Sequence, residues 1–259
     1  VYKQVLNIGI VGAGVGGLSC ALMLKKLGHK VTIFEKQSKS ISSGVGIQLS
    51  SNAIRILRLF DLEDSIASVA NFPSMVDCIN GHNGKKITSI PLGKIAEKKF
   101  NAGFYQLHRN DLISILKNKV EDFGIKINYG SAVNNLTQNS SNVKIQLLNH
   151  NYNYDFVIGA DGVNSLVRKK IFPNHKPRFL KQVAFRSLIP SKNIPGLFLQ
   201  DKTLLFLGNG KHAVSYPIKD KAFINFVFCI DTENFYEQDL TRKVDTSELI
   251  KSFSDFIIF

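Results

Sequence analysis

The stretch that decides the fold is Gly12-Ala13-Gly14-Val15-Gly16-Gly17. It follows the apolar run Val5–Val11, whose length and composition predict a buried parallel strand. It precedes Leu18–Leu27, where small and apolar residues recur at helical spacing. A second apolar run, Val31–Phe34, ends at Glu35. A glycine turn between strand and helix, followed about 20 residues later by an acid, predicts a dinucleotide-binding βαβ unit.

Each part of this glycine motif has a physical reason. Gly12 allows the tight turn, Gly14 lets a pyrophosphate approach the backbone, and Gly17 lets the helix pack closely on the strand. The N–H groups at the helix start would bind the phosphate charge. Glu35 is placed to accept hydrogen bonds from a ribose diol, and its charge disfavours a 2′-phosphate, so NADP is not expected here. The alternative is a glycine-rich turn without a ligand.

Composition is that of an ordinary globular protein. The 259 residues suffice for one large domain or two smaller ones, with 44% hydrophobic and 20% charged residues. No apolar run reaches about 18 residues, so no membrane-spanning helix is expected. The net charge is +13, but the lysines are scattered, so we expect no nucleic-acid partner. A basic surface would still attract anionic cofactors and substrates.

The three cysteines, Cys20, Cys78 and Cys229, lie far apart and form no C-x-x-C pair. They predict buried, reduced thiols in a cytoplasmic protein. No cluster with metal-ligand spacing is visible in the sequence, so no metal is expected.

Strand and helix patterns predict an α/β fold with two domains. Helical patterns follow Ser50 and run from near Asn110 to Gly124, and residues 75–90 alternate as a hairpin would. Beyond residue 180 the chain becomes rich in β-formers, which predicts a mostly antiparallel sheet. These runs are 182–189, 203–208, 212–217 and 222–230. We expect a discontinuous nucleotide-binding domain, 1–72 with 100–180, and a β-rich domain, 73–99 with 181–259.

A second motif begins where the hydrophobic strand Phe156–Ile158 leads into Gly159-Ala160-Asp161-Gly162. A short helix bearing Arg168 follows. Alone, this pattern is an ordinary turn, since Asp-Gly is common in turns. About 150 residues after a dinucleotide fingerprint, it favours a second contribution to the same site.

Four local patterns resemble those of one family. They are GAGVGGLSCALMLKKLGHKVTIFEK at 12–36, GVGIQLSSNAIRIL at 44–57, LHRNDL at 107–112 and GADGVNSLVRKKI at 159–171, with a weaker match at 210–228. In this order the chain resembles the FAD-dependent aromatic hydroxylases, which are class A flavoprotein monooxygenases, and most of all the salicylate hydroxylase type. The resemblance implies a Rossmann-type FAD-binding domain of the para-hydroxybenzoate hydroxylase kind with a β-rich substrate domain.

The resemblance also implies which residues hold FAD. Glu35 would bind the adenosine ribose, Gln48 would lie near the flavin, and Arg109 would contact FAD. Asp161 would belong to an Asp-Gly motif that serves both FAD and NAD(P)H. For Arg109 the alternative is a surface residue at the start of the next helix. The matching positions are Gly12, Gly14, Gly16, Gly17, Glu35, Lys36, Gln48, Arg109, Val133, whose backbone would meet the adenine, and Asp161.

In this family NADH or NADPH reduces the flavin, which takes up O2 as a C4a-hydroperoxide and hydroxylates a small aromatic, phenolic acid-like substrate. The protein supplies orientation, a dry site and often a base. His212 and Tyr216 share one face of a predicted strand and are the catalytic candidates, with two ordinary strand residues as the alternative. Arg186 could hold a substrate carboxylate or be a solvated surface arginine.

The chain departs from the family in one respect. A third family motif, Gly-Asp followed by an Ala-rich helix, contributes to the flavin site and is not found in the sequence. We therefore expect a chain that lacks its C-terminal portion. Besides an active hydroxylase, two alternatives stay open: a non-catalytic remnant with weak nucleotide binding, and another FAD- or NAD-dependent oxidoreductase.

Overall fold

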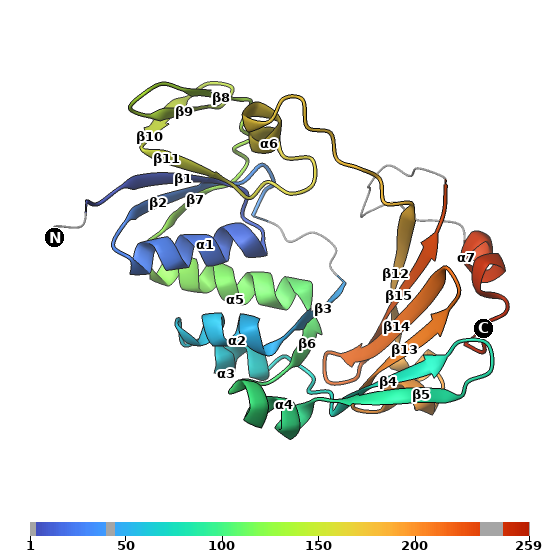
Figure 1. The fold of residues 1–259 in the computed structure, drawn as a ribbon. Helices are drawn as coiled ribbons and strands as arrows, with labels where there is room; N and C mark the ends of the chain where they lie inside the picture. The colour runs from blue at the N-terminus through green and yellow to red at the C-terminus, as the bar shows by residue number, and fades with distance from the viewer. Residues whose placement is uncertain (1–3, 40–44, 234–245, 259) are drawn as a thin grey trace. The chain divides into compact units, whose positions relative to one another are not determined.

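The computed structural model describes residues 4–39, 45–233 and 246–258, so Gly44 of the second quoted pattern lies outside the described residues. The chain forms two compact units (Figure 1). The first unit comprises Val1–Ser42 and Leu112–Pro177, and the second comprises Ser43–Asp111 and Arg178–Phe259.

The first unit is built on a parallel sheet with the strand order β11-β1-β2-β7. Its central strand β1 is buried from Ile8 to Val11, as expected for a strand covered on both faces. Helices α1 and α5 run side by side on one face of the sheet (Figure 1). The strands are β1 (Asn7–Val11), β2 (Lys30–Phe34), β7 (Lys126–Asn128) and β11 (Phe156–Gly159), and the helices are α1 (Val15–Lys26), α5 (Arg109–Asp122) and α6 (Leu166–Ile171).

The other face of this sheet is covered by a small antiparallel sheet with the order β10-β9-β8. Ile145 and Tyr154 from its strands pack with Phe34 and Val11 of the parallel sheet in one apolar cluster. The βαβ unit, its helix and the strand Phe156–Ile158 are thus confirmed. The strands of the small sheet are β8 (Asn135–Gln138), β9 (Val143–Gln146) and β10 (Asn151–Tyr154).

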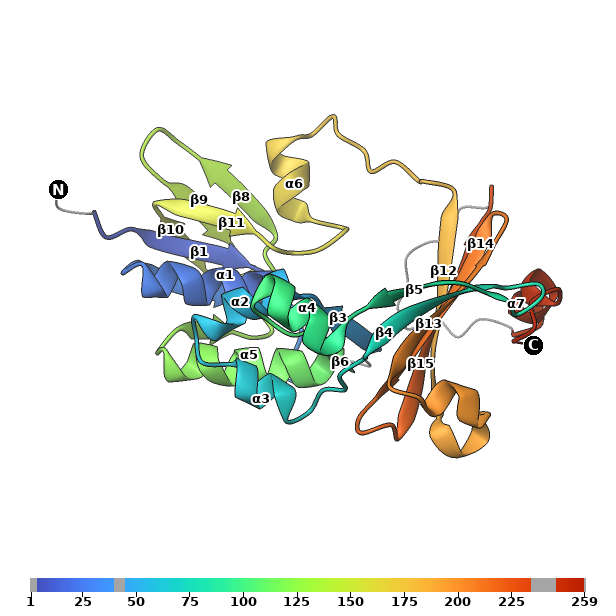
Figure 2. The same cartoon turned by 60° about the horizontal axis from the view of Figure 1, so that its bottom comes forward.

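The second unit contains a six-stranded sheet with the order β12-β15-β14-β13-β4-β5. Neighbouring strands are antiparallel except β13 and β4, which are parallel, so the mostly antiparallel sheet is confirmed. Figure 2 shows the β4–β5 hairpin continuing the sheet beyond β13. The strands are β4 (Met75–Asn80), β5 (Lys86–Pro91), β12 (Gln182–Pro190), β13 (Lys202–Gly208), β14 (Lys211–Ile218) and β15 (Phe223–Asp231).

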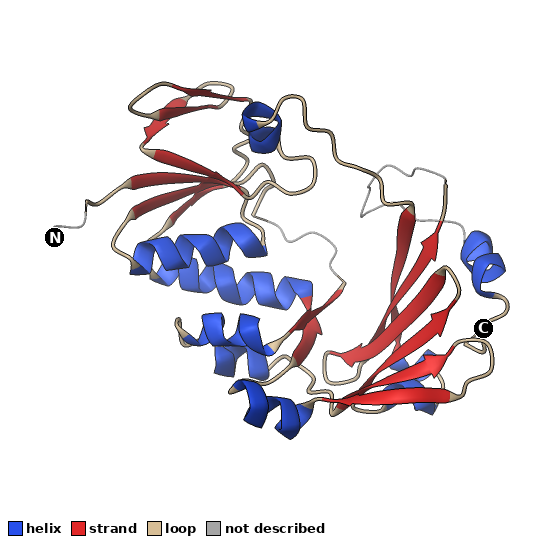
Figure 3. Cartoon of the chain, viewed as in Figure 1, coloured by secondary structure: helices blue, strands red, loops and turns tan. Residues whose placement is uncertain are grey.

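A two-stranded antiparallel ribbon, β3 (Gly46–Leu49) with β6 (Tyr105–His108), also belongs to the second unit. Short helices complete this unit, and Figure 3 shows them in blue beside the red strands. They are α2 (Ser51–Arg58), α3 (Glu63–Ala67), α4 (Gly93–Phe100) and α7 (Thr246–Phe253), with the 3-10 turns η1 (Ser191–Asn193) and η2 (Gly196–Leu199).

The bounds of the compact units differ from the predicted domain bounds. Residues 43–72 and 100–111, expected in the nucleotide-binding domain, fall in the unit that contains the six-stranded sheet. The physical reason is that the ribbon is bonded to this sheet: the Gly46 amide donates to Asn225, and Gln106 donates to Thr203. The assignment of FAD and substrate binding to separate domains stays a prediction.

Candidate functional site

The glycine turn has the geometry that the motif predicts. Gly12 has a φ of +106°, a conformation that a side chain would strain, and its amide donates to Phe34 O at 2.7 Å. A side chain at Gly12 would also collide with the carbonyl oxygen of Ala160, and one at Gly17 would collide with that of Gly12. These two glycines are therefore required by the fold of the turn itself.

Gly14 and Gly16 differ, because a Cβ atom built on either would meet nothing within 4 Å. The backbone of the turn is therefore open on this side. Helix α1 begins at Val15, and its N-cap residue Gly14 provides no side-chain hydrogen bond to the first amides of the helix. In contrast, the first amides of α6 donate to the side chains of Asp161 and Ser165. An uncapped helix start beside an open glycine backbone fits a pyrophosphate group.

Glu35 follows β2 and braces the turn. Its Oε2 accepts a hydrogen bond from the Ala13 amide at 2.7 Å, and its Oε1 accepts one from the Gln37 amide at 2.8 Å. A carboxylate has about four lone-pair sites, so both oxygens keep capacity for ribose hydroxyls. Lys36, next to it, is exposed. The local geometry therefore fits the predicted ribose contact and adds a role in holding the glycine turn.

The structure brings the two predicted turns together. Strand β11 pairs with β1 in parallel, and Ala160 donates its amide to Val11 O at 2.8 Å, directly before Gly12. Asp161 is occupied in this turn: its carboxylate accepts from Leu166 N at 2.6 Å, from Val167 N at 3.2 Å and from Ser165 Oγ at 2.5 Å. Its direct bond to a cofactor stays a prediction.

Val133 lies between β7 and β8, half-buried, where it packs against the apolar cluster that contains Phe34 and Tyr154. Its side chain is therefore held by the first unit. The backbone contact with adenine predicted for Val133 stays a prediction.

Gln48 and Arg109 are placed by the β3–β6 ribbon. Gln48 is exposed and lies directly opposite Gln106 on β6, so both side chains are on one face of the ribbon. Arg109 is the first residue of α5, and its amide donates to Val45 O at 2.9 Å. Among the described residues its guanidinium forms no ion pair with a carboxylate. Asp111 in the first turn of the same helix supplies an anion at this helix start, so the contact of Arg109 with FAD stays a prediction.

His212, Tyr216 and Arg186 lie on one face of the six-stranded sheet. On β14, His212 and Tyr216 flank Val214, and across β15 the register joins Val214 to Val227 and Val227 to Arg186. His212 and Tyr216 are about 13 Å apart along the strand, from a rise of about 3.3 Å per residue. The half-buried valines between these polar groups form an apolar floor that suits an aromatic ring. We call this surface the polar-rimmed face.

Tyr216 is nearly fully buried, and burial raises the pKa of its hydroxyl to about 12, an effect that the charge of Arg186 partly offsets. Arg186 is exposed, and its Nη2 donates to Gly46 O at 3.2 Å. The Tyr216 hydroxyl thus stays protonated at neutral pH and is suited to donate a hydrogen bond.

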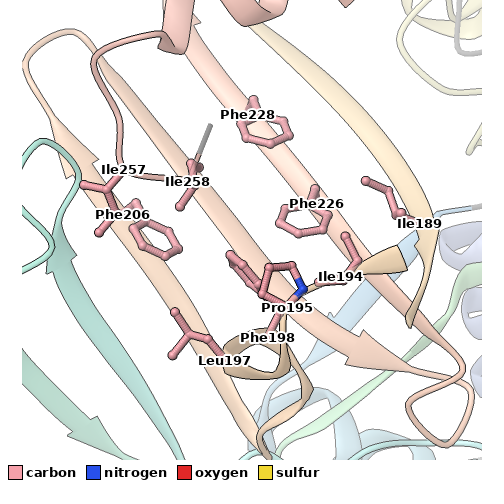
Figure 4. A pocket seen from close by; sticks show the side chains of 10 residues that line it. All are labelled: Ile189, Ile194, Pro195, Leu197, Phe198, Phe206, Phe226, Phe228, Ile257 and Ile258. Atoms are coloured by element: carbon pink, nitrogen blue, oxygen red, sulfur yellow. The ribbon is translucent and has the colours of Figure 1, made fainter. Parts of the chain in front are cut away.

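The opposite face of the six-stranded sheet carries an apolar pocket of about 350 Å³ (Figure 4). Phe226 and Phe228 alternate along β15 with Asn225 and Val227, so they point away from the polar-rimmed face. The pocket has no charged or hydrogen-bonding side chain to orient a substrate. Its lining residues are Ile189, Ile194, Pro195, Leu197, Phe198, Phe206, Phe226, Phe228, Ile257 and Ile258.

Sequence reasoning missed Asn225, which is fully buried on the polar-rimmed face beside Tyr216. Its Oδ1 accepts from the Gly46 amide at 2.8 Å, and its Nδ2 has no hydrogen-bond partner among the described residues. The available signal was a single amide side chain within the apolar run 223–228.

Neither a membrane nor a metal is indicated by the described part of the chain. No helix there combines the length and the apolar character that crossing a bilayer requires. Within the same residues, His, Cys, Asp and Glu side chains form no group of three or more that could hold a metal ion.

Comparison with known proteins agrees with this geometry. The family described as "FAD binding domain" matches residues 4–252. Over 222 residues the chain is 30% identical to 3-amino-4-hydroxybenzoate 2-monooxygenase from Streptomyces cremeus, covering 85% of this chain and 56% of that protein. Over 255 residues it is 26% identical to 6-hydroxynicotinate 3-monooxygenase from Pseudomonas fluorescens, covering 97% of this chain and 66% of that protein.

Among solved structures, CtdE in complex with FAD and substrate 4 has the same fold, with a TM-score of 0.86 at 19% identity, covering 97% of this chain and 63% of that one. The chain belongs to the class A FAD-dependent monooxygenases, the aromatic hydroxylase family, and FAD is the cofactor of that family. The predicted family and fold class are thereby confirmed. The chain spans 56% and 66% of the length of the two curated relatives.

Proposed function

We propose that the protein is an FAD-dependent, NAD(P)H-using monooxygenase that hydroxylates a small aromatic acid carrying a ring hydroxyl. The observation that carries this proposal is the open glycine turn: Gly14 and Gly16 face free space, α1 begins without a side-chain cap, and Glu35 stands beside them. Such a turn suits the ADP part of FAD. NAD(P)H as the reductant and reduced cysteines favour the cytoplasm as its location.

Each residue group has a defined task in this proposal. FAD, when bound, supplies the redox chemistry that moves one oxygen atom of O2 to the ring. The glycine turn and Arg109 bind its negative charge, and Glu35 binds its ribose. On the polar-rimmed face Arg186 attracts the carboxylate of the substrate. Tyr216 and His212 lie at opposite ends of the apolar floor and are two candidates for contact with the ring hydroxyl, Tyr216 as a hydrogen-bond donor and His212 as the acceptor of the phenolic proton.

The names of the relatives support an acidic ring as substrate. One acts on 3-amino-4-hydroxybenzoate and the other on 6-hydroxynicotinate, both of which combine a ring hydroxyl with a carboxylate. The polar-rimmed face offers one cation, Arg186, at the border of an apolar floor formed by Val214 and Val227. This combination suits a flat ring with a single carboxylate better than a neutral aromatic.

The test begins with the absorption spectrum of the purified chain after addition of FAD. Flavin bands that stay with the protein on a desalting column support the site. Oxidation of NADH and of NADPH is then followed with a panel of hydroxybenzoates and hydroxynicotinates. The amount of hydroxylated product is compared with the amount of H2O2 formed in the same reaction. A chain that binds FAD but forms no product with any acid would favour the non-catalytic alternative, and a chain that binds no FAD would contradict the proposal.

Tyr216→Phe should lower kcat/KM by about fivefold, the effect of one lost hydrogen bond of about 1 kcal/mol. The shape of the pH–rate profile between about pH 6 and pH 9 should stay as in the wild type, because a hydroxyl whose pKa is about 12 does not titrate there. Tyr154→Phe, the same change at a buried tyrosine of the first unit, is the control. A limb of the profile that disappears in Tyr216→Phe alone would show that this tyrosine is the base.

A further inference from the structure

Both backbone groups of Gly46 are held by side chains of the six-stranded sheet. The Gly46 amide donates to Asn225 Oδ1 at 2.8 Å in a buried hydrogen bond. Its carbonyl oxygen accepts from Arg186 Nη2 at 3.2 Å. Asn225 lies on β15 and Arg186 on the neighbouring β12, so two strands bind one residue at the start of β3.

This contact requires glycine at position 46. A Cβ atom there would lie 2.7 Å from Asn225 Cγ and 2.7 Å from Tyr216 Oη, closer than real Cβ contacts come. The ribbon is tied to the sheet a second time, because Gln106 Nε2 donates to Thr203 Oγ1 at 2.6 Å. Gln106 is the cross-strand partner of Gln48. The ribbon that carries Gln48 is therefore bonded to the six-stranded sheet through both of its strands, at Gly46 of β3 and at Gln106 of β6.

The chemistry of Asn225 indicates that its oxygen atom is the required group. The residue is fully buried, and its Nδ2 has no hydrogen-bond partner among the described residues. A buried, unpaired donor is costly, and an apolar side chain of similar size would avoid that cost. An acceptor for the Gly46 amide is the benefit that asparagine provides here and leucine does not.

We propose that Asn225 is a positioning residue: by binding Gly46 it sets the place of β3 and so presents Gln48, two residues further along the strand, to the flavin. The inference rests on the proposed function, because it takes Gln48 as a neighbour of the bound flavin. Asn225 itself touches the backbone of Gly46 and acts through the strand. Without its oxygen, β3 keeps its pairing with β6 but loses its buried anchor on the sheet.

The test compares Asn225→Ala with Asn225→Asp, which keeps an oxygen acceptor for the amide. Ser215→Ala is the matched control, since Ser215 is buried on the neighbouring strand, faces the opposite side of the sheet and has no partner for its hydroxyl among the described residues. Amide hydrogen exchange of Gly46 in the FAD-free chain should become more than about tenfold faster in Asn225→Ala and stay near the wild-type rate in the other two variants.

The second measurement uses FAD. In Asn225→Ala the dissociation constant of FAD should rise about tenfold and the visible circular dichroism of the bound flavin should change, whereas Asn225→Asp should restore both. Unchanged Gly46 exchange in Asn225→Ala would overturn the anchor. Faster exchange with unaltered FAD affinity and flavin spectrum would overturn the positioning role.

Failure of the proposed function and failure of the Asn225 anchor would give different results. A wild-type chain without FAD binding contradicts the proposed function before any variant is compared, and the exchange rates still decide whether Asn225 anchors β3. If Asn225→Ala does not fold, Asn225→Ser serves the same comparison, because its shorter side chain fills part of the space without reaching the amide.

Discussion

Glu35→Ala should weaken FAD binding by at least about tenfold and up to about a hundredfold. A hydrogen bond to a charged group contributes about 1.5–3 kcal/mol, and each 1.4 kcal/mol changes the dissociation constant tenfold. The variant would also lose the bond between Glu35 Oε2 and the Ala13 amide, which braces the glycine turn. Flavin fluorescence titration measures the effect.

Two further variants make this result specific. Glu35→Gln keeps an oxygen that accepts from Ala13 but loses the charge, so its affinity should lie between those of the wild type and Glu35→Ala. Glu121→Ala removes an exposed carboxylate of the same unit, which forms an ion pair with Lys39 at the surface, and should bind FAD like the wild type. An unchanged dissociation constant in Glu35→Ala would remove the ribose contact from the proposal.

Alanine substitutions at two glycines of the turn should have different effects, Gly12→Ala on the stability of the fold and Gly14→Ala on FAD binding. In Gly12→Ala the positive φ and the collision with the Ala160 carbonyl should destabilise the fold by about 3 kcal/mol or more, on the order of 10 °C in the melting temperature. In Gly14→Ala the stability should change by less than about 1 kcal/mol, because a poorer helix cap and a less flexible unfolded chain nearly cancel.

FAD affinity should be affected differently from stability, because Gly14→Ala should weaken FAD binding although it barely changes the stability of the fold. The methyl group of Gly14→Ala points into open space where the pyrophosphate would approach, so binding should weaken at least about tenfold in a fully folded protein. Thermal denaturation without FAD and flavin titration at low temperature measure the two effects separately. Equal FAD affinity for Gly14→Ala and wild type would place the pyrophosphate elsewhere.

The local parts of the site could be predicted from sequence because the backbone geometry of contiguous residues determines where each of them lies. The glycine turn, Glu35 and the Asp161 turn follow from a strand, a tight turn and a helix that are contiguous in the chain. The shared face of His212 and Tyr216 follows from the period of a strand. Arg186 could be named from its charge, but its place beside them depends on β15 lying between β12 and β14.

The long-range parts could not be predicted, because they depend on pairing between short segments far apart in the chain. The ribbon joins β3 to β6, two strands of four residues each, and periodicity in so short a run has little weight. The bond from Gly46 to Asn225 spans 179 residues. These contacts also explain why the compact units divide near residues 42 and 111 and not at the predicted bounds.

The two unlike faces of the six-stranded sheet restrict how this protein can change its length. Deleting one residue of β15 before Asn225 would place Phe226 where Asn225 now lies and would turn Phe226 and Phe228 toward the polar-rimmed face. The protein should therefore tolerate insertions and deletions at the hairpin tip 219–221. Inside the strands it should tolerate deletion of two residues, which keeps each side chain on its face, better than deletion of one. A deletion scan that measures the yield of folded protein should give higher yields for two-residue than for one-residue deletions within the strands. Equal yields for both would refute the prediction.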